Sequence, residues 1–330
     1  MKKNDVTCLN DFLKIIFNID NNIDEILKKY FEKINDCNNI NIKKLSLSKY
    51  YKNDRFKIDF NRFSNKFKNI YQYITFFYRG QFNNEYKLIP FCFRGDYLFE
   101  ENQIKNYAIS NYPDEFRNLN QLEILVKMQH YGFPTRILDV TTNPLVALYF
   151  ACKNFSKKCE NSTGSVYVFC ELNEKILSKF SDKAIMCAAL SSLSNKDKNL
   201  LYSKCYDAYL HKKQLNCKIG EKFYHEICKD TPFENRIKSR DLLRNYYLMP
   251  PFNNERIKNQ NGAFIITGLS KDNKEMETKI NNEVLFKIDI DNKYKSIILN
   301  ELDNISINEK FLFPELEHLI KYEKEKIIKE

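Results

Sequence analysis

Residues 129–155 read QHYGFPTRILDVTTNPLVALYFACKNF, and this stretch decides the fold. The β-branched run at residues 137–141 predicts a strand. Pro144 follows as a first helical residue, and residues 145–155 are almost wholly apolar. A helix that is apolar all round must be buried. The stretch therefore predicts a strand that runs directly into a helix inside the core.

Further elements flank this stretch on both sides. Residues 54–74 carry apolar side chains at spacings of three and four, which predicts an amphipathic helix. Residues 119–128 predict a helix that ends before Gly132 and Pro134. The remaining predicted elements are strands over residues 75–78, 164–172, 263–269 and 283–290, a helical block over residues 182–229 with turns near residues 195–197 and 220, and a final helix that Pro314 opens.

This order of elements predicts an α+β fold in which a mixed β-sheet core is flanked by helices and carries a helical insertion. We expect an N-terminal helical or irregular extension over residues 1–53 and a core over residues 54–181. The helical insertion covers residues 182–230. The strands and helix of residues 231–330 are expected to complete the same domain as the core.

Composition narrows the class of protein. No apolar run approaches the roughly 20 residues of a membrane span, and the N-terminus lacks the apolar core of a signal peptide. The ten cysteines form no C-x-x-C pair. The formal charge of +10 is spread along the chain, so it favours acidic partners without naming one. We therefore expect a cytoplasmic protein without a membrane span.

The predicted helix over residues 54–74 mixes basic and aromatic side chains, as some nucleic-acid-binding surfaces do. Such surfaces stack bases on exposed rings. Here Phe56, Phe60, Phe63 and Phe67 fall on one helical stripe. We expect this stripe to face the core, and contact with nucleic acid is the alternative.

The first candidate site is Tyr78-Arg79-Gly80-Gln81. An arginine at the end of a short strand meets a glycine that lets backbone or ligand approach closely. The guanidinium of such an arginine can donate two hydrogen bonds to a phosphate or carboxylate. The alternative is an arginine that pairs with a structural carboxylate beside a turn.

The second candidate site is residues 129–144, which place many polar and charged side chains beside apolar elements. Polar groups held next to a core must be paired or used. Arg136 and Asp139 can pair with each other, and Thr142 or Asn143 can cap the helix, but these ordinary roles explain the density poorly. We therefore expect four ionisable residues to converge on one cleft, namely Arg79, His130, Arg136 and Asp139.

A third candidate is the polar run over residues 254–264, where Arg256 and Gln260 are reasonable ligand contacts and an ordinary turn is the alternative. A zinc site is not expected. Of the four nearby His and Cys residues, only His225 and Cys228 have a zinc-like spacing, and they fall within a predicted helix.

These motifs resemble the FRG domain family, named for the (F/Y)-R-G motif that stands here as Tyr78-Arg79-Gly80. The resemblance covers about residues 60–320. At Val140 the chain departs from the family, which has an aromatic residue there, usually Trp. Other matching positions are Leu88-Ile89-Pro90, Phe93-Arg94, Gln129 to Gly132, Pro134 to Arg136, Leu138-Asp139, Thr141, Asn143-Pro144, Ala147 to Ala151, Asn254, Arg256-Ile257, Gln260, Gly262 to Phe264 and Leu312 to Pro314. The family is often found in mobile elements and phage defence, so the resemblance implies a toxin or defence context.

A second, layout-level resemblance concerns the order of the motifs. An arginine on a first strand, a Ser/Thr-rich strand running into an A-x-x-F-A helix, and a late Gln/Glu-bearing strand are similar to the layout of ADP-ribosyltransferases. This implies NAD as the cofactor, with Arg79 on a phosphate or ribose and Thr141 bracing the nicotinamide pocket. Glu255 or Gln260 would then lie near the place of the catalytic acid. A carboxylate there stabilises an oxocarbenium-like centre, and a glutamine supplies no charge.

Two classes of function follow. One is an NAD-dependent ADP-ribosyltransferase-like effector that modifies a protein or nucleic acid, and the other is a non-catalytic module that binds a nucleotide or a partner. A carboxylate beside Arg79 and His130 in one cleft favours the enzyme. The candidate catalytic residues are Arg79, His130, Asp139, Glu255 and Gln260. The candidate cofactor-binding residues are Arg79, Gln81, Arg94, Gln129, Tyr131, Thr135, Arg136, Thr141, Asn143 and Arg256.

Overall fold

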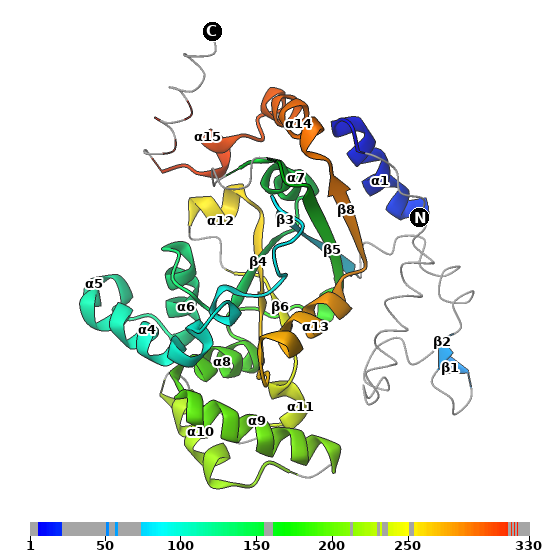
Figure 1. Cartoon of the computed structure of the whole chain (residues 1–330). Coiled ribbons are helices and arrows are strands. Elements are labelled where there is room, and N and C mark those ends of the chain that lie inside the picture. The colour runs from blue at the N-terminus through cyan, green and yellow to red at the C-terminus, as the bar shows by residue number, and fades with distance from the viewer. Residues whose placement is uncertain are drawn as a thin grey trace.

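The computed structural model has one six-stranded antiparallel sheet at its centre, with the strand order β6-β7-β4-β3-β5-β8 (Figure 1). The α+β fold class is thereby confirmed, although the sheet expected to be mixed is antiparallel at every pairing of these strands. The strands are β3 Ile74–Gln81, β4 Ile137–Thr141, β5 Gly164–Leu172, β6 Tyr246–Leu248, β7 Gly262–Ile266 and β8 Phe286–Ile290. The structure describes residues 6–21, 51–52, 57–58, 74–154, 161–211, 214–229, 232, 237–250, 254–315, 318, 320 and 322.

Helices surround the sheet. Figure 1 shows α8 to α11 together at one end of the molecule and α7, α14 and α15 at the other. No helix in the described ranges has the length and apolar character that crossing a membrane requires. The helices are α1 Leu9–Asn21, α4 Tyr97–Asn111, α5 Pro113–Phe116, α6 Gln121–His130, α7 Pro144–Cys152, α8 Asp182–Ala189, α9 Asn195–Leu210, α10 Lys218–Cys228, α11 Ser239–Leu242, α12 Glu255–Asn259, α13 Asn273–Glu283, α14 Asn292–Asn304 and α15 Glu309–Leu312.

The β4–α7 unit forms as the sequence predicts. Asn143 is the N-cap of α7, because its side-chain oxygen accepts a hydrogen bond from Leu145 N at 2.9 Å. The helix lies directly on β3 at Gly80, where an added Cβ would come within 1.9 Å of the Ala147 carbonyl oxygen. Only glycine permits this approach, so the third residue of the Y-R-G motif has a packing role.

The two faces of the sheet are covered differently. Successive side chains along a strand point to opposite faces. Val166 and Val168 of β5 pack with α7 and α14, while Tyr167 and Phe169 pack on the other face with residues 88–98 and α13. On β4 and β7, the face that α7 shares is covered instead by α6, α8 and α10. One face therefore carries two separate groups of helices.

The predicted helix over residues 54–74 is wrong at two places. Lys57–Ile58 form the short strand β2, which pairs with β1, Tyr51–Lys52, and Ile74 is the first residue of β3. Residues 59–73 and the side chains of the aromatic stripe lie outside the described residues. Periodicity cannot foresee backbone pairing, which takes precedence over it here. For the same reason β3 continues through Gln81, since β5 pairs with it along its whole length.

The helical block has the predicted type and different boundaries. Ser194 caps α9, so the first break comes just before Asn195. The second break lies between α9 and α10, and Gly220 is inside α10 rather than at a turn. Strand β8 begins at Phe286 because Glu283 still belongs to α13.

Candidate functional site

A cavity of about 280 Å³ lies between the two groups of helices that share one face of the sheet. It opens where β3 and β4 separate, since these strands are joined by the single pair Tyr78 and Thr141. The lining residues are Tyr78, Arg79 and Gly80 of β3, Asp139, Val140 and Thr141 of β4, Gly262, Ala263 and Phe264 of β7, Val126, Gln129 and His130 of α6, Val146, Ala147 and Phe150 of α7, and Arg256, Ile257 and Gln260 in and just after α12.

Arg79 spans the gap between the two strands. Continuing the antiparallel register from Tyr78 and Thr141 would place Arg79 opposite Val140, but these two residues do not pair. Instead, Arg79 Nη1 donates a hydrogen bond to the backbone carbonyl of Asp139 at 2.5 Å. Arg79 lines the cavity, and the described residues offer no acceptor to its remaining donors.

The guanidinium of Arg79 is poorly satisfied. Its Nε is buried without a hydrogen-bond partner, and the bond to the Asp139 carbonyl is the one hydrogen bond that the described residues give this side chain. Burial lowers the pKa of Arg79 to about 10, although the nearby charge of Asp139 raises it. A half-buried cation with one neutral acceptor is poised for an anion.

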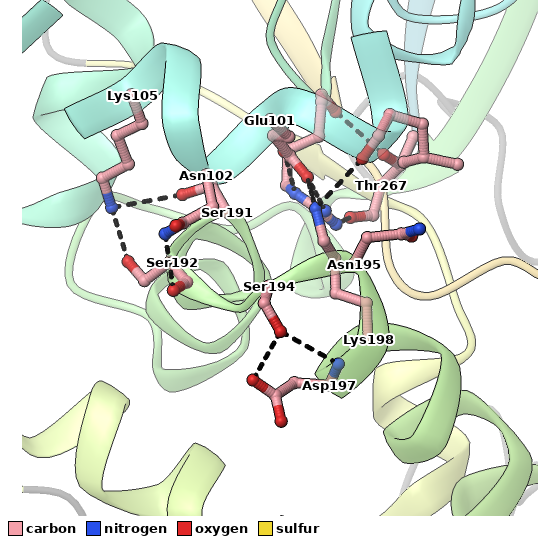
Figure 2. A network of polar contacts seen from close by, with 12 residues as sticks. Glu101, Asn102, Lys105, Ser191, Ser192, Ser194, Asn195, Asp197, Lys198 and Thr267 are labelled. Carbon is pink, nitrogen blue, oxygen red and sulfur yellow. Dashed lines mark hydrogen bonds and ion pairs between the residues drawn. The ribbon is translucent and has the colours of Figure 1, made fainter. Parts of the chain in front are cut away.

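Arg136, expected in the same cleft, lies elsewhere. Its Nε and Nη2 donate to the two carboxylate oxygens of Glu101 at 2.7 and 2.5 Å, and Nη1 donates to the Thr267 carbonyl at 3.2 Å. Lys198 Nζ donates to the same carboxylate at 2.7 Å, and Figure 2 shows Glu101, Lys198 and Thr267 in this network. Arg136 therefore pairs with neither Asp139 nor a ligand in the cavity, because α4 brings it a buried carboxylate.

Asp139 brings a carboxylate to the cavity beside Arg79. Gln129 Nε2 donates a hydrogen bond to Asp139 Oδ2 at 2.7 Å. The hydroxyl of Thr135 donates to Gln129 Oε1. Thr135 is fully buried and does not line the cavity, so its predicted contact with a cofactor is replaced by a contact with Gln129.

His130 is the last residue of α6 and lines the same cavity. Burial lowers the pKa of His130 below its ordinary value of 6.5, and the positive charge of Arg256 lowers it further. The imidazole is therefore neutral at pH 7 and can accept a proton. Arg79, His130 and Asp139 thus lie around one cavity, although α6 and β4 are far from β3 in sequence.

One carboxylate near His130 was not singled out in the sequence. Glu315 follows Pro314 in the C-terminal segment, and its charge raises the pKa of His130 against the effects of burial and Arg256. Its Oε2 atom is buried and has no hydrogen-bond partner among the described residues. The Leu312-Phe313-Pro314 match just before it was the available signal.

The third predicted run contributes Arg256 and Gln260 to the cavity but not Glu255. Thr141 Oγ1 donates to the Gln260 backbone carbonyl at 2.6 Å, which ties the end of α12 to β4. Gln260 Nε2 donates to the Leu312 carbonyl at 3.0 Å. Glu255 is exposed and outside the lining, so Asp139 is the carboxylate that the cavity offers.

Four other predicted site residues do not line the cavity. Gln81 is buried at the end of β3, and its Oε1 has no partner in the described part of the chain. Arg94 donates to the Ile89 carbonyl at 3.2 Å, and burial lowers its pKa although the charge of Asp139 opposes the shift. Tyr131 is exposed and donates to Glu115 Oε2 at 3.1 Å, and Asn143 caps α7.

Within the described ranges, no three His, Cys, Asp or Glu side chains lie close enough together to hold a metal ion. His211, Cys217, His225 and Cys228 belong to this described part of the chain.

Residues 74–160 match the family model of the FRG domain. No curated protein and no solved structure matches the chain. The matched range runs from the first residue of β3 through β4 and α7, and it includes Arg79, Gln129, His130 and Asp139. It stops before α12, which lies outside the match. The chain therefore carries an FRG domain over residues 74–160, and that domain supplies the ionisable centre of the cavity.

Proposed function

We propose that the cavity binds a nucleotide and that the protein is an NAD-dependent ADP-ribosyltransferase-like enzyme. The observation that supports this best is that Arg79 lines the cavity while its guanidinium makes one hydrogen bond, to the Asp139 carbonyl, and no ion pair among the described residues. A desolvated cation costs free energy unless an anion or several acceptors compensate it. A phosphate group has the charge and the geometry to accept from the uncommitted donors.

Asp139 and His130 provide the complementary chemistry. NAD supplies the ADP-ribosyl group, with nicotinamide as the leaving group. Asp139 stabilises the positive charge that develops on the ribose as the bond from its C1′ to nicotinamide breaks and nicotinamide takes the electron pair. His130 accepts the proton that the nucleophile of the target loses as it bonds to C1′.

The target in this proposal is a protein or nucleic acid, modified in the cytoplasm as part of a toxin or phage-defence activity. Arg256 and Thr141 border the cavity and would contact the ligand or the target. The net charge of +10 favours approach to an acidic target.

The cavity volume favours a second candidate function. About 280 Å³ lies just below the roughly 300–1,000 Å³ of ordinary small-molecule sites. This volume suits a mononucleotide better than a whole dinucleotide. A non-catalytic module that binds a nucleotide to regulate a partner is therefore the alternative.

The test is to incubate the purified protein with NAD labelled in its adenylate part, with and without cell extract, and to follow both nicotinamide release and label on macromolecules. Calorimetry with NAD and with AMP measures binding separately. If the protein is the proposed enzyme, the wild type should release nicotinamide. The Asp139→Asn variant should still bind NAD but should no longer release nicotinamide. Nucleotide binding without release supports the regulatory module.

Arg79→Ala should weaken the affinity for the nucleotide about 100-fold or more, because it removes a charge-assisted two-point contact. The melting temperature should hardly change, since Arg79 makes one neutral hydrogen bond. Arg79→Lys should rescue poorly, because a lysine lacks the planar fork. Arg117→Ala is the matched control, as Arg117 is exposed and its one ion pair in the described part of the chain is with Asp114. Unchanged binding in Arg79→Ala, or unfolding of that variant, would rule the proposal out.

A further inference from the structure

A chain of hydrogen bonds leads from a buried hydroxyl to the carboxylate of the cavity. The backbone N–H of Ile137 donates to Thr135 Oγ1 at 3.3 Å. The Thr135 hydroxyl donates to Gln129 Oε1, and Gln129 Nε2 donates to Asp139 Oδ2 at 2.7 Å. The bonds join the start of β4 to the last turn of α6 and back to the middle of β4.

The direction of each bond in this chain is fixed. Thr135 Oγ1 already accepts from Ile137 N, so its proton is available to Gln129. The amide of Gln129 must then place its oxygen toward Thr135 and its NH₂ group toward Asp139. A flipped amide would set its oxygen against the carboxylate and its NH₂ group against the hydroxyl proton. Asp139, which can only accept, and Thr135, which donates its proton to the amide oxygen, together favour one of the two orientations of Gln129.

The orientation of Gln129 determines how the two carboxylate oxygens of Asp139 are used. Its Oδ2 is held by Gln129, while Oδ1 accepts no hydrogen bond from the described residues. Because Asp139 is exposed and borders the cavity, Oδ1 is the oxygen that a ligand can reach. A carboxylate that is free to rotate would present either oxygen, or neither, in the direction of the ligand.

We propose that Gln129 and Thr135 are positioning residues, which fix the orientation of the Asp139 carboxylate so that Oδ1 meets a hydroxyl donor of the ligand such as a ribose hydroxyl. This inference rests on the proposed function for the role of Asp139, and it assigns to Gln129 and Thr135 a role other than cofactor contact. Thr135 is fully buried and reaches the ligand only through two other side chains.

The first test removes the hydroxyl. Thr135→Val should weaken NAD binding about tenfold, which corresponds to one charge-assisted hydrogen bond, whereas Thr135→Ser should stay within about twofold of the wild type. Thr278→Val is the matched control, because among the described residues the Thr278 hydroxyl bonds only to the Lys274 carbonyl on α13. Equal losses in Thr135→Ser and Thr135→Val would assign Thr135 to packing alone and overturn the proposal.

The second test measures how NAD affinity depends on pH. A purely structural role of Gln129 would give the variant no pH dependence of its own. In Gln129→Glu the introduced carboxyl lies against Asp139, so the two groups share one proton and the apparent pKa of the pair rises. At low pH the protonated carboxyl donates to Asp139 as the amide does, and NAD affinity should approach the wild-type value. As pH rises, the two charges repel and affinity should fall about 100-fold. At each pH, the NAD affinity of the variant is divided by that of the wild type. This ratio cancels the titration of His130 and the fixed charges of Arg79, Arg94 and Arg256, which both proteins share. A ratio independent of pH would refute the positioning role.

A readout without ligand separates this inference from the proposed function. The side-chain amide protons of Gln129 should shift in the ¹⁵N NMR spectrum in both Thr135→Val and Asp139→Asn, and not in Thr278→Val. If wild type binds no nucleotide but these shifts appear, the proposed function fails and the hydrogen-bond chain stands. If the amide signals stay unchanged in Thr135→Val, the positioning inference fails, whatever the protein binds.

Discussion

The Glu101 carboxylate is buried and accepts hydrogen bonds from two cations, Arg136 and Lys198. Asp139, by contrast, is exposed at the cavity and accepts from one neutral amide. Both residues are carboxylates close to Arg136 or Arg79, and their local sequences do not distinguish them. Their partners assign Glu101 to the core and leave Asp139 available, so the role of each residue follows from tertiary contacts.

Glu101 should make folding stability depend on pH. Burial alone would raise the pKa of Glu101, but Arg136 and Lys198 outweigh it and lower the pKa from 4.5 to about 2. A depressed folded-state pKa stabilises the protein above the unfolded value, and that stability is lost as pH falls from about 4.5 toward 2. The loss should be roughly 3 kcal/mol over this window in urea unfolding.

Glu101→Gln tests the same network at neutral pH. The variant leaves two buried cations without a counter-charge, so it should lose about 3–5 kcal/mol at pH 7 and lack this pH dependence. Glu255→Gln, an exposed carboxylate, is the control. A Glu101→Gln protein as stable as wild type would show that the buried triad contributes little.

At the scale of elements, the sequence predicted β4, α7 and β5 well because local signals agree there. Proline at the helix start, a capping asparagine and continuous apolar runs all indicate one structure. Helix α4 gave no such signal, although its buried residues Leu98, Glu101, Lys105 and Ala108 are spaced as one helical stripe. Two of these four are charged, so apolar periodicity could not reveal the buried face.

Gly80→Ala should disrupt the contact between β3 and α7. The added methyl group would lie 1.9 Å from the Ala147 carbonyl oxygen and 2.7 Å from Ala151 N, which are backbone atoms that cannot rotate away. We expect a loss of about 3 kcal/mol in urea unfolding, the upper end for overpacking. Gly132→Ala is the control, since open space surrounds Gly132 and its φ of +79° costs only about 1 kcal/mol. Equal losses would show that α7 can move away from β3.

At the scale of the whole molecule, the order of the strands in the sheet could not be predicted from the sequence. Strand β4 pairs with β7 more than a hundred residues later, and this register joins the Gln129 to Pro144 motif to α12. The motifs predicted a cluster of polar residues. Only the order of the strands shows that Arg79 contacts Asp139 and that Arg136 lies apart from both. The lining of the cavity could therefore be predicted only in part from the sequence, and its geometry could not be predicted.

The helical block predicted as an insertion shares its core with the sheet. One cluster of buried side chains joins α8, α9 and α10 to Ile137 of β4 and to Phe264 and Ile266 of β7. Lys198 of α9 also bonds to Glu101 of α4, as Figure 2 shows. A shared core of this kind predicts that the block and the sheet unfold as one cooperative unit.

Phe223→Ala tests this coupling from within α10. The Phe223 ring is fully buried in the shared cluster, so its removal should cost about 3–5 kcal/mol. If the block and the sheet are one unit, hydrogen exchange should accelerate equally for the slowest amides of α9 and of β5, although β5 contributes no side chain to the cluster that contains Phe223. Phe180→Ala, which truncates a ring that is 79% exposed, should change neither. Acceleration confined to the helices would instead make residues 182–230 a separately folding unit, attached to a sheet that is stable without it.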